Sequence, residues 1–138
     1  MAGDIEILIV EDSQTQAELL RNLLEGRGCR VTVAGDGRQA LAAIERRRPT
    51  LVVSDIEMPV MDGYELCHAI KHNPQLADIP VILLTSLSDP ADVLRGLEAR
   101  ADYYLTKPFD KGFLLARVEA VLFEPHAAHG DAFGAPLE

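Results

Sequence analysis

Five polar side chains stand at the ends of short, mainly apolar runs, where a strand would end and a loop begin. They come from four separate segments of the chain and are Glu11, Asp12, Asp55, Thr85 and Lys107. Carboxylates crowded together stay ionised only beside a cation, and an all-oxygen set favours Mg²⁺. A divalent metal with a lysine and a hydroxyl suits a phosphoryl group, which an aspartate can accept as an aspartyl-phosphate.

The stretch at 51–63, LVVSDIEMPVMDG, contains the central carboxylate of this set. An apolar run ends at Asp55, and a loop marked by proline and glycine follows. Such a run followed by turn residues is typical of a buried strand that leaves the sheet. Asp55 is therefore predicted at the carboxyl end of a strand, where open α/β sheets bind their ligands.

Strand-like and helix-like patterns alternate along the rest of the chain. Ser13 with Gln16 has capping-box spacing, and Asp62 with Glu65 lies at the same spacing before a third helix. Arg100 stands in the turn before the fifth strand. Strands are predicted at 5–10, 30–34, 51–55, 81–84 and 103–105, and helices begin near 13, 36, 62, 88 and 110.

Five strands alternating with five helices predict an α/β fold with a doubly wound parallel sheet and helices on both faces. The segment at 30–34, RVTVA, alternates polar and apolar residues and suits an edge strand. The strand order 2-1-3-4-5 accounts for that edge. It also brings the ends of strands one, three, four and five, with the five polar residues, to one pocket.

Length and composition indicate one soluble domain of 138 residues, with 48% apolar residues and a net charge of −9. The acidic balance argues against a nucleic-acid binder. No apolar run approaches the roughly 20 residues of a membrane span, and no signal pattern opens the chain. Cys29 and Cys67 are predicted as reduced thiols, and the protein as cytoplasmic. Residues 125–138 lack periodicity and are expected to form a disordered tail, either a linker or an expression-vector remnant.

On these residues the chain resembles the receiver domain of bacterial two-component response regulators, over residues 4–124. The matching positions are Glu11-Asp12, Asp55 in a D-x-x-M-P-x-M-D-G stretch, Thr85 and Lys107-Pro108. The resemblance implies the flavodoxin-like receiver fold. It also implies that Asp55 accepts a phosphoryl group from the phosphohistidine of a sensor histidine kinase or a phosphotransfer protein.

The resemblance further implies a role for each residue of the site. Asp12 and Asp55 would bind Mg²⁺ directly with the backbone carbonyl of Glu57, and Glu11 would act through water. Lys107 would pair with the phosphoryl group, and its bond to Pro108 would be cis.

A conformational switch is implied as well. Thr85 would bond a phosphoryl oxygen, and Tyr104 would fill the space that Thr85 leaves, repacking a surface of helix four, strand five and helix five. Glu57 and Leu87 are expected to modulate the site. Arg100 departs from the family, which often has glycine there, and this could alter the turn before strand five.

Several alternatives stay open. A phosphatase of the haloacid-dehalogenase type would carry D-x-D-x-T/V after the first strand, where this chain has E-D-S. A flavodoxin-like cofactor binder would need a phosphate loop or G-x-G-x-x-G, and neither is present.

The expected protein is a signalling module that catalyses only its own phosphorylation and dephosphorylation. It could stand alone, shuttle phosphoryl groups, or form part of a hybrid kinase or a larger regulator. Its downstream protein target is unknown and a homodimer is an option. No nucleic acid is expected to bind this domain alone, and no membrane is expected as a partner.

Overall fold

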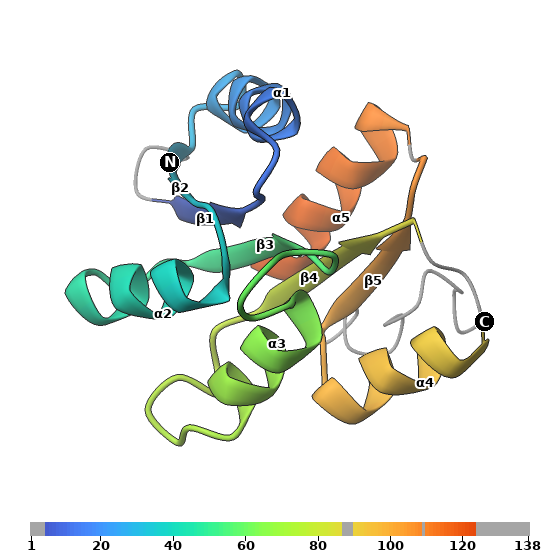
Figure 1. The fold of residues 1–138 in the computed structure, drawn as a ribbon. Coiled ribbons are helices and arrows are strands. Elements are labelled where there is room, and N and C mark those ends of the chain that lie inside the picture. Colours follow the sequence, from blue (N-terminus) through green and yellow to red (C-terminus); the bar gives the residue numbers. More distant parts are fainter. Residues whose placement is uncertain (1–4, 87–89, 109, 124–138) are drawn as a thin grey trace.

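The computed structural model describes residues 5–86, 90–108 and 110–123, and shows an open parallel sheet with helices on both faces (Figure 1). The strand order β2-β1-β3-β4-β5, with all four pairs parallel, is the order predicted. The predicted tail and Leu87 lie outside the described residues. The strands are β1 (Glu6–Val10), β2 (Arg30–Ala34), β3 (Leu51–Asp55), β4 (Val81–Thr85) and β5 (Tyr103–Thr106).

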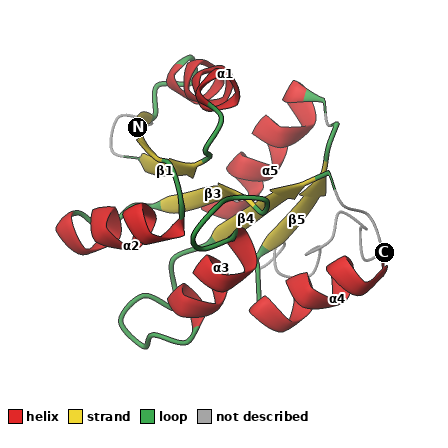
Figure 2. Cartoon of the chain, viewed as in Figure 1, coloured by secondary structure: helices red, strands yellow, loops and turns green. Residues whose placement is uncertain are grey.

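The helices form two layers around the sheet (Figure 2). Apolar side chains of α1 and α5 pack with one face of the strands, and those of α2, α3 and α4 pack with the other. None of the helices in the described part of the chain has the length and apolar character needed to cross a bilayer. The helices are α1 (Gln14–Glu25), α2 (Gly37–Arg46), α3 (Gly63–Lys71), α4 (Pro90–Ala99) and α5 (Lys111–Phe123).

Burial along the strands follows the predicted pattern. Every residue of β3 and β4 is buried, because helices cover both faces of these strands. At the edge of the sheet, most residues of β2 are exposed or half-buried, as expected from its alternating sequence. The unbroken apolar runs are therefore central strands, and the alternating run is the edge.

The two capping boxes suggested by the sequence differ. At α3, the Asp62 side chain accepts the Glu65 N–H, and the Glu65 side chain accepts the Asp62 N–H, both at 2.9 Å. At α1, Ser13 Oγ accepts the N–H of Gln16 at 3.3 Å, but the Gln16 side chain does not return to Ser13. The Ser13 N–H donates instead to Glu11 Oε2, at 3.1 Å. The prediction that the Gln16 side chain completes a capping box at α1 is therefore wrong. The charged Glu11 carboxylate is a stronger acceptor for the Ser13 N–H than an amide oxygen.

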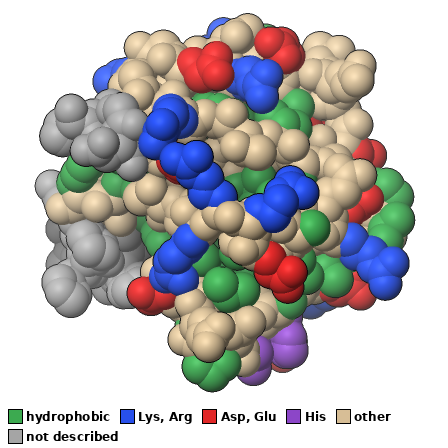
Figure 3. Space-filling model, turned by 90° about the vertical axis from the view of Figure 1, so that its left-hand side faces the viewer, with side chains coloured by type: hydrophobic (Ala, Val, Ile, Leu, Met, Phe, Trp, Pro, Cys, Tyr) green, Lys and Arg blue, Asp and Glu red, His purple; other side chains and the backbone are tan. Residues whose placement is uncertain are grey.

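Charge is unevenly distributed along the chain. Residues 14–50 hold seven of the 13 basic residues and four of the 22 acidic residues, a net charge of +3, so the remainder carries −12. Figure 3 looks onto the side that lies to the left in Figure 1, where α1, β2 and α2 are found, and shows Lys and Arg side chains in a broken row across it. The acidic excess therefore lies in the other parts of the chain.

A buried ion pair joins α3 to the amino ends of β4 and β5. Lys71 Nζ lies 2.7 Å from Asp102 Oδ2, and both residues are only 8% exposed. The ammonium also donates to the carbonyls of Ala77 and Ile79, and the same Asp102 oxygen accepts the N–H of Val81 at 2.8 Å. Three separate segments are thus held at one point by a satisfied pair of charges.

We expect Lys71→Met to lower the free energy of unfolding by about 3–5 kcal/mol, because it leaves the Asp102 carboxylate buried without its cation. Urea denaturation monitored by circular dichroism measures this loss. Lys111→Met is the matched control, since Lys111 is exposed on α5, and its effect should stay within about 0.5 kcal/mol. Equal losses in the two variants would contradict the structural role of the pair.

The turn after α4 has a left-handed residue that is not glycine. Arg100 directly follows Ala99, the last residue of α4, and has a φ of 65°. Gly28, in the turn after α1, has a φ of 87°. The arginine therefore keeps the backbone conformation that glycine adopts more easily, at a cost of about 1–2 kcal/mol for a residue with a Cβ.

Arg100→Gly should raise the free energy of unfolding by about 0.5–1 kcal/mol, because part of the relief is offset by the greater freedom of glycine in the unfolded chain. Thermal and urea unfolding measure the change. Arg100→Ala removes the side chain but keeps the Cβ, so it should bring little gain. Gly28→Ala should destabilise the protein. A gain from Arg100→Ala equal to that from Arg100→Gly would assign the effect to the side chain and not to the backbone.

Candidate functional site

The carboxyl ends of the strands bring together side chains far apart in the sequence. Glu11 and Asp12 follow β1, and Asp55 is the last residue of the neighbouring strand β3. One carboxylate oxygen from each of these three residues lies within 4.8 Å of the others. Within the described ranges, this is the one group of three or more His, Cys, Asp or Glu side chains close enough to share a metal ion.

The loop after β3 closes tightly against Asp55. A Cβ at Gly63 would lie 2.5 Å from the Asp55 carbonyl oxygen, so only glycine fits this close approach. The Gly63 N–H donates to the carbonyl of Ile56 at 3.0 Å. Val60 in the same loop has a φ of 70°, a strained conformation for a β-branched residue. The loop thus packs tightly against the backbone at Asp55, a residue that is only 6% exposed.

Lys107 supplies the positive charge of the site. Its Nζ lies 3.2 Å from Asp55 Oδ1 and 3.9 Å from Glu11 Oε1. Its backbone N–H donates to the carbonyl of Thr85 at 2.6 Å, which ties β5 to the end of β4, and the bond to Pro108 is cis, as predicted. A single cation therefore faces two buried carboxylates.

Gln16 is a residue of the site that the sequence did not reveal. Its Oε1 accepts a hydrogen bond from Lys107 Nζ at 3.0 Å. The capping-box spacing from Ser13 predicts that this side chain belongs to the helix cap. The only signal in the sequence was its place four residues after Asp12, in the first turn of the helix that leaves the site.

Burial dominates the electrostatics of the two buried carboxyls. It raises the pKa of Asp55 above the ordinary value, and Lys107 lowers it only in part. Burial likewise raises the pKa of Glu11, while the hydrogen bond from the Ser13 N–H lowers it and the neighbouring Asp55 raises it further. Without a further cation, the folded protein thus disfavours the ionised form of both groups.

Two buried oxygens in this cluster bear on whether the residues present fit a cation. Glu11 Oε1 and Asp55 Oδ1 are buried and accept no well-aligned hydrogen bond, and the Lys107 ammonium lies 3.9 and 3.2 Å from them. Unsatisfied buried carboxylate oxygens are costly, and a hard divalent ion satisfies them. With the exposed carboxylate of Asp12 they form an all-oxygen set, so the residues present fit Mg²⁺.

The neighbouring loops hold the other predicted residues. Thr85 is fully buried at the end of β4. The Glu57 side chain is exposed and accepts a hydrogen bond from Ser86 Oγ at 2.9 Å, which links the loops after β3 and β4. The Glu57 carboxylate is therefore directed towards the β4 loop.

Tyr104 is buried on β5, 5% exposed, and belongs to the core on the α3 and α4 side of the sheet. Its hydroxyl lies 3.2 Å from the hydroxyl of Tyr64 on α3. The guanidinium of Arg95 on α4 lies 4.3 Å from the centre of the Tyr64 ring. Tyr104 thus contacts α3 directly and α4 through Tyr64.

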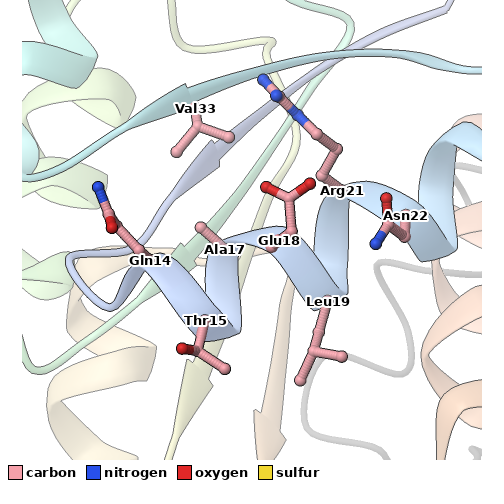
Figure 4. A pocket seen from close by; sticks show the side chains of 8 residues that line it. All are labelled: Gln14, Thr15, Ala17, Glu18, Leu19, Arg21, Asn22 and Val33. Atoms are coloured by element: carbon pink, nitrogen blue, oxygen red, sulfur yellow. The ribbon is translucent and has the colours of Figure 1, made fainter.

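Two hollows lie along α1. An open groove of about 720 Å³ between α1 and β2 is lined by residues such as Gln14, Glu18 and Val33, and contains none of the predicted site residues (Figure 4). A smaller hollow of about 270 Å³ is lined by Glu11, Gln16 and Lys107, together with leucines of α1 and Leu84. Of the three acids in the cluster, only Glu11 lines this smaller hollow.

The sequence matches the family described as the response regulator receiver domain over residues 7–119. The chain belongs to this family. The receiver domain is 41% identical over 116 residues to the DNA-binding response regulator MtrA of Mycolicibacterium paratuberculosis, a match that covers 84% of the chain and 50% of MtrA. The chain thus spans about half the length of the curated relatives it matches.

Two solved structures agree with this assignment. The signal receiver domain of a histidine kinase from Syntrophus aciditrophicus has a TM-score of 0.82 and 50% identity, covering 85% of this chain and 89% of its own. The receiver domain of the sensor histidine kinase PA1611 from Pseudomonas aeruginosa PAO1, with a magnesium ion coordinated in its active site cleft, has a TM-score of 0.79 and 32% identity, covering 86% and 97%. Both structures are described as receiver domains of histidine kinases, in agreement with the family match.

The raised pKa of Asp55 leads to a pH-dependent stability. The folded state binds the Asp55 proton more tightly than the unfolded chain, so stability falls as the pH rises from about 3.8 through the folded pKa. With EDTA present, Asp55→Asn should therefore raise the free energy of unfolding at neutral pH, and this gain should shrink as the pH falls toward 3.8.

Urea denaturation at a series of pH values checks this expectation. Glu18→Gln, on the exposed face of α1, is the control and should show little pH-dependent difference from the wild type. A loss of stability in Asp55→Asn at neutral pH would mean that the ion pair with Lys107 outweighs the burial of the carboxylate.

Proposed function

We propose that this receiver domain, residues 4–124, accepts a phosphoryl group on Asp55 from the phosphohistidine of a sensor histidine kinase or phosphotransfer protein. The observation that carries this proposal is the buried Asp55 carboxylate between Lys107 and the two acids that follow β1. A carboxylate nucleophile, a fixed cation and a cluster suited to a divalent metal are the parts that phosphoryl transfer requires.

In the transfer, an oxygen of Asp55 attacks the phosphorus atom. The new O–P bond forms while the P–N bond of the phosphohistidine breaks, and the electron pair stays on the departing imidazole nitrogen. Lys107 pairs with the negative charge on the phosphoryl oxygens, and the Thr85 hydroxyl donates to one of them. The chain's own residues thus orient the nucleophile and neutralise the transferred group.

Asp12 and Asp55 would hold Mg²⁺ with the backbone carbonyl of Glu57, and Glu11 would act through water. Bound Mg²⁺ supplies charge neutralisation for the carboxylates and the phosphoryl oxygens. The unsatisfied oxygens of Glu11 and Asp55 support this assignment, as does the magnesium ion in the PA1611 receiver. The link between Glu57 and Ser86 supports a modulating role for Glu57 at the rim of the site.

Phosphorylation would shift the population of conformations of a surface formed by α4, β5 and α5. Thr85 and Tyr104 would couple this surface to the phosphorylated site. The burial of Tyr104 against Tyr64 supports this coupling, because any movement of the Tyr104 ring must repack α3 and α4. This surface would bind a downstream protein target or a second copy of the domain.

Because MtrA is named a DNA-binding response regulator, a receiver of this kind could control DNA binding by another domain. The domain would act in the cytoplasm, and its only chemistry would be its own phosphorylation and dephosphorylation.

Asp55→Asn should abolish phosphorylation by acetyl phosphate with Mg²⁺, because an amide oxygen is a far weaker nucleophile than a carboxylate. Intact-protein mass spectrometry detects the added phosphoryl group in the wild type. Asp78→Asn, at an exposed carboxylate before β4, should be labelled at the wild-type rate. Labelling of Asp55→Asn to the same extent would exclude Asp55 as the acceptor.

A further inference from the structure

The side chain of Gln16 reaches from α1 to the cation of the phosphoacceptor site. Its Oε1 accepts from Lys107 Nζ at 3.0 Å, a shorter distance than the 3.2 Å from Lys107 to Asp55. The two residues are 91 positions apart in the sequence, and Gln16 is exposed while Lys107 is half-buried. Gln16 thus contacts Lys107 from the solvent side of the site.

The local structure of α1 leaves this amide available. In the complete capping box of α3, the Glu65 side chain returns to the N–H of Asp62. At α1 the corresponding N–H, that of Ser13, already donates to the Glu11 carboxylate. The Gln16 amide is therefore not needed in the cap, and it binds Lys107 instead.

The backbones of both partners are fixed. Ser13 Oγ accepts the N–H of Gln16, which anchors the first turn of α1. The N–H of Lys107 donates to the carbonyl of Thr85 at the end of β4. Between two fixed backbones, the contact restrains the flexible four-carbon stem of the lysine, whose free rotation would otherwise move the ammonium away from Asp55.

The neutrality of the amide matters for the chemistry. A carboxylate at this position would add a negative charge beside Glu11, Asp12 and Asp55 and would compete for the positive charge of the lysine. An amide oxygen accepts one of the three N–H groups and leaves the charge of the ammonium for the phosphoryl group. We infer that Gln16 is a positioning residue, which holds the Lys107 ammonium at Asp55 for phosphoryl transfer. The inference rests on the proposed function of Asp55.

The test compares two identical substitutions on one helix. Gln16→Met keeps an unbranched side chain of similar length but removes the acceptor. Gln14→Met makes the same change in the groove between α1 and β2 (Figure 4), and Gln14 does not line the hollow that contains Gln16 and Lys107. With acetyl phosphate and Mg²⁺, we expect Gln16→Met to be phosphorylated about three- to tenfold more slowly than the wild type, the loss of one partly exposed hydrogen bond to a charged group. Gln14→Met should match the wild type.

A second measurement reads the position of the lysine without phosphorylation. The chain has three lysines, so nitrogen-15 NMR of the ammonium groups can follow Lys107 directly, with the buried Lys71 as an internal reference. In Gln16→Met the Lys107 signal should broaden through faster hydrogen exchange, while the Lys71 signal stays unchanged. A slower rate together with this broadening supports the inference.

The outcomes separate the inference from the function on which it rests. Wild-type protein that is not labelled on Asp55 would overturn the proposed function. Wild-type protein that is labelled, with Gln16→Met equal to Gln14→Met in rate and in the Lys107 signal, would overturn the positioning role alone. Thermal unfolding of all variants is measured alongside, and if Gln16→Met is slower only because it is less folded, the Lys71 signal changes as well, which also overturns the inference.

Discussion

Repulsion among carboxylates at one edge of the sheet is the constraint on which the rest of this domain depends. Glu11, Asp12 and Asp55 would separate in a flexible chain, and only the parallel pairing of β1 with β3 brings them within 4.8 Å. Backbone hydrogen bonds and apolar burial on both faces supply the force that holds these strands together. Lys107, delivered from β5 and tied to β4, offsets part of the repulsion. The fold therefore keeps the three carboxylates close together despite their mutual repulsion.

Stability and chemistry lie at opposite ends of the same strands. At the amino ends of β4 and β5, Lys71 and Asp102 form a pair in which each charge has several partners. At the carboxyl ends, one buried oxygen of Glu11 and one of Asp55 accept no well-aligned hydrogen bond, and Val60 has a left-handed backbone. Such a division is common in functional proteins, where a strained site is supported by satisfied structure elsewhere. Buried polar groups are therefore well satisfied at the amino ends of the strands and less so at the carboxyl ends.

The sequence predicts most of the fold because the signals are local. Unbroken apolar runs mark central parallel strands, and the pair Asp62 and Glu65 marks a helix start, since both patterns act within a few residues. The partner of Gln16 was not predictable in this way. Its spacing from Ser13 fits a cap equally well, and the competing lysine lies 91 positions away. Lys71 is a similar case, because a lysine in the last turn of a helix normally points to solvent, and only the position of Asp102 in three dimensions explains its burial.

The tyrosines of this chain give it an optical property of its own. The sequence has no tryptophan, and its three tyrosines, at positions 64, 103 and 104, are all buried on or beside β5. Tyrosine emission therefore comes from one region of the protein, without energy transfer to an indole. Two of the phenols lie hydroxyl to hydroxyl, and the guanidinium of Arg117 lies 4.8 Å from the centre of the third ring. Any rearrangement of β5 should change the intrinsic tyrosine fluorescence intensity, so the conformation of this strand can be followed without an added label.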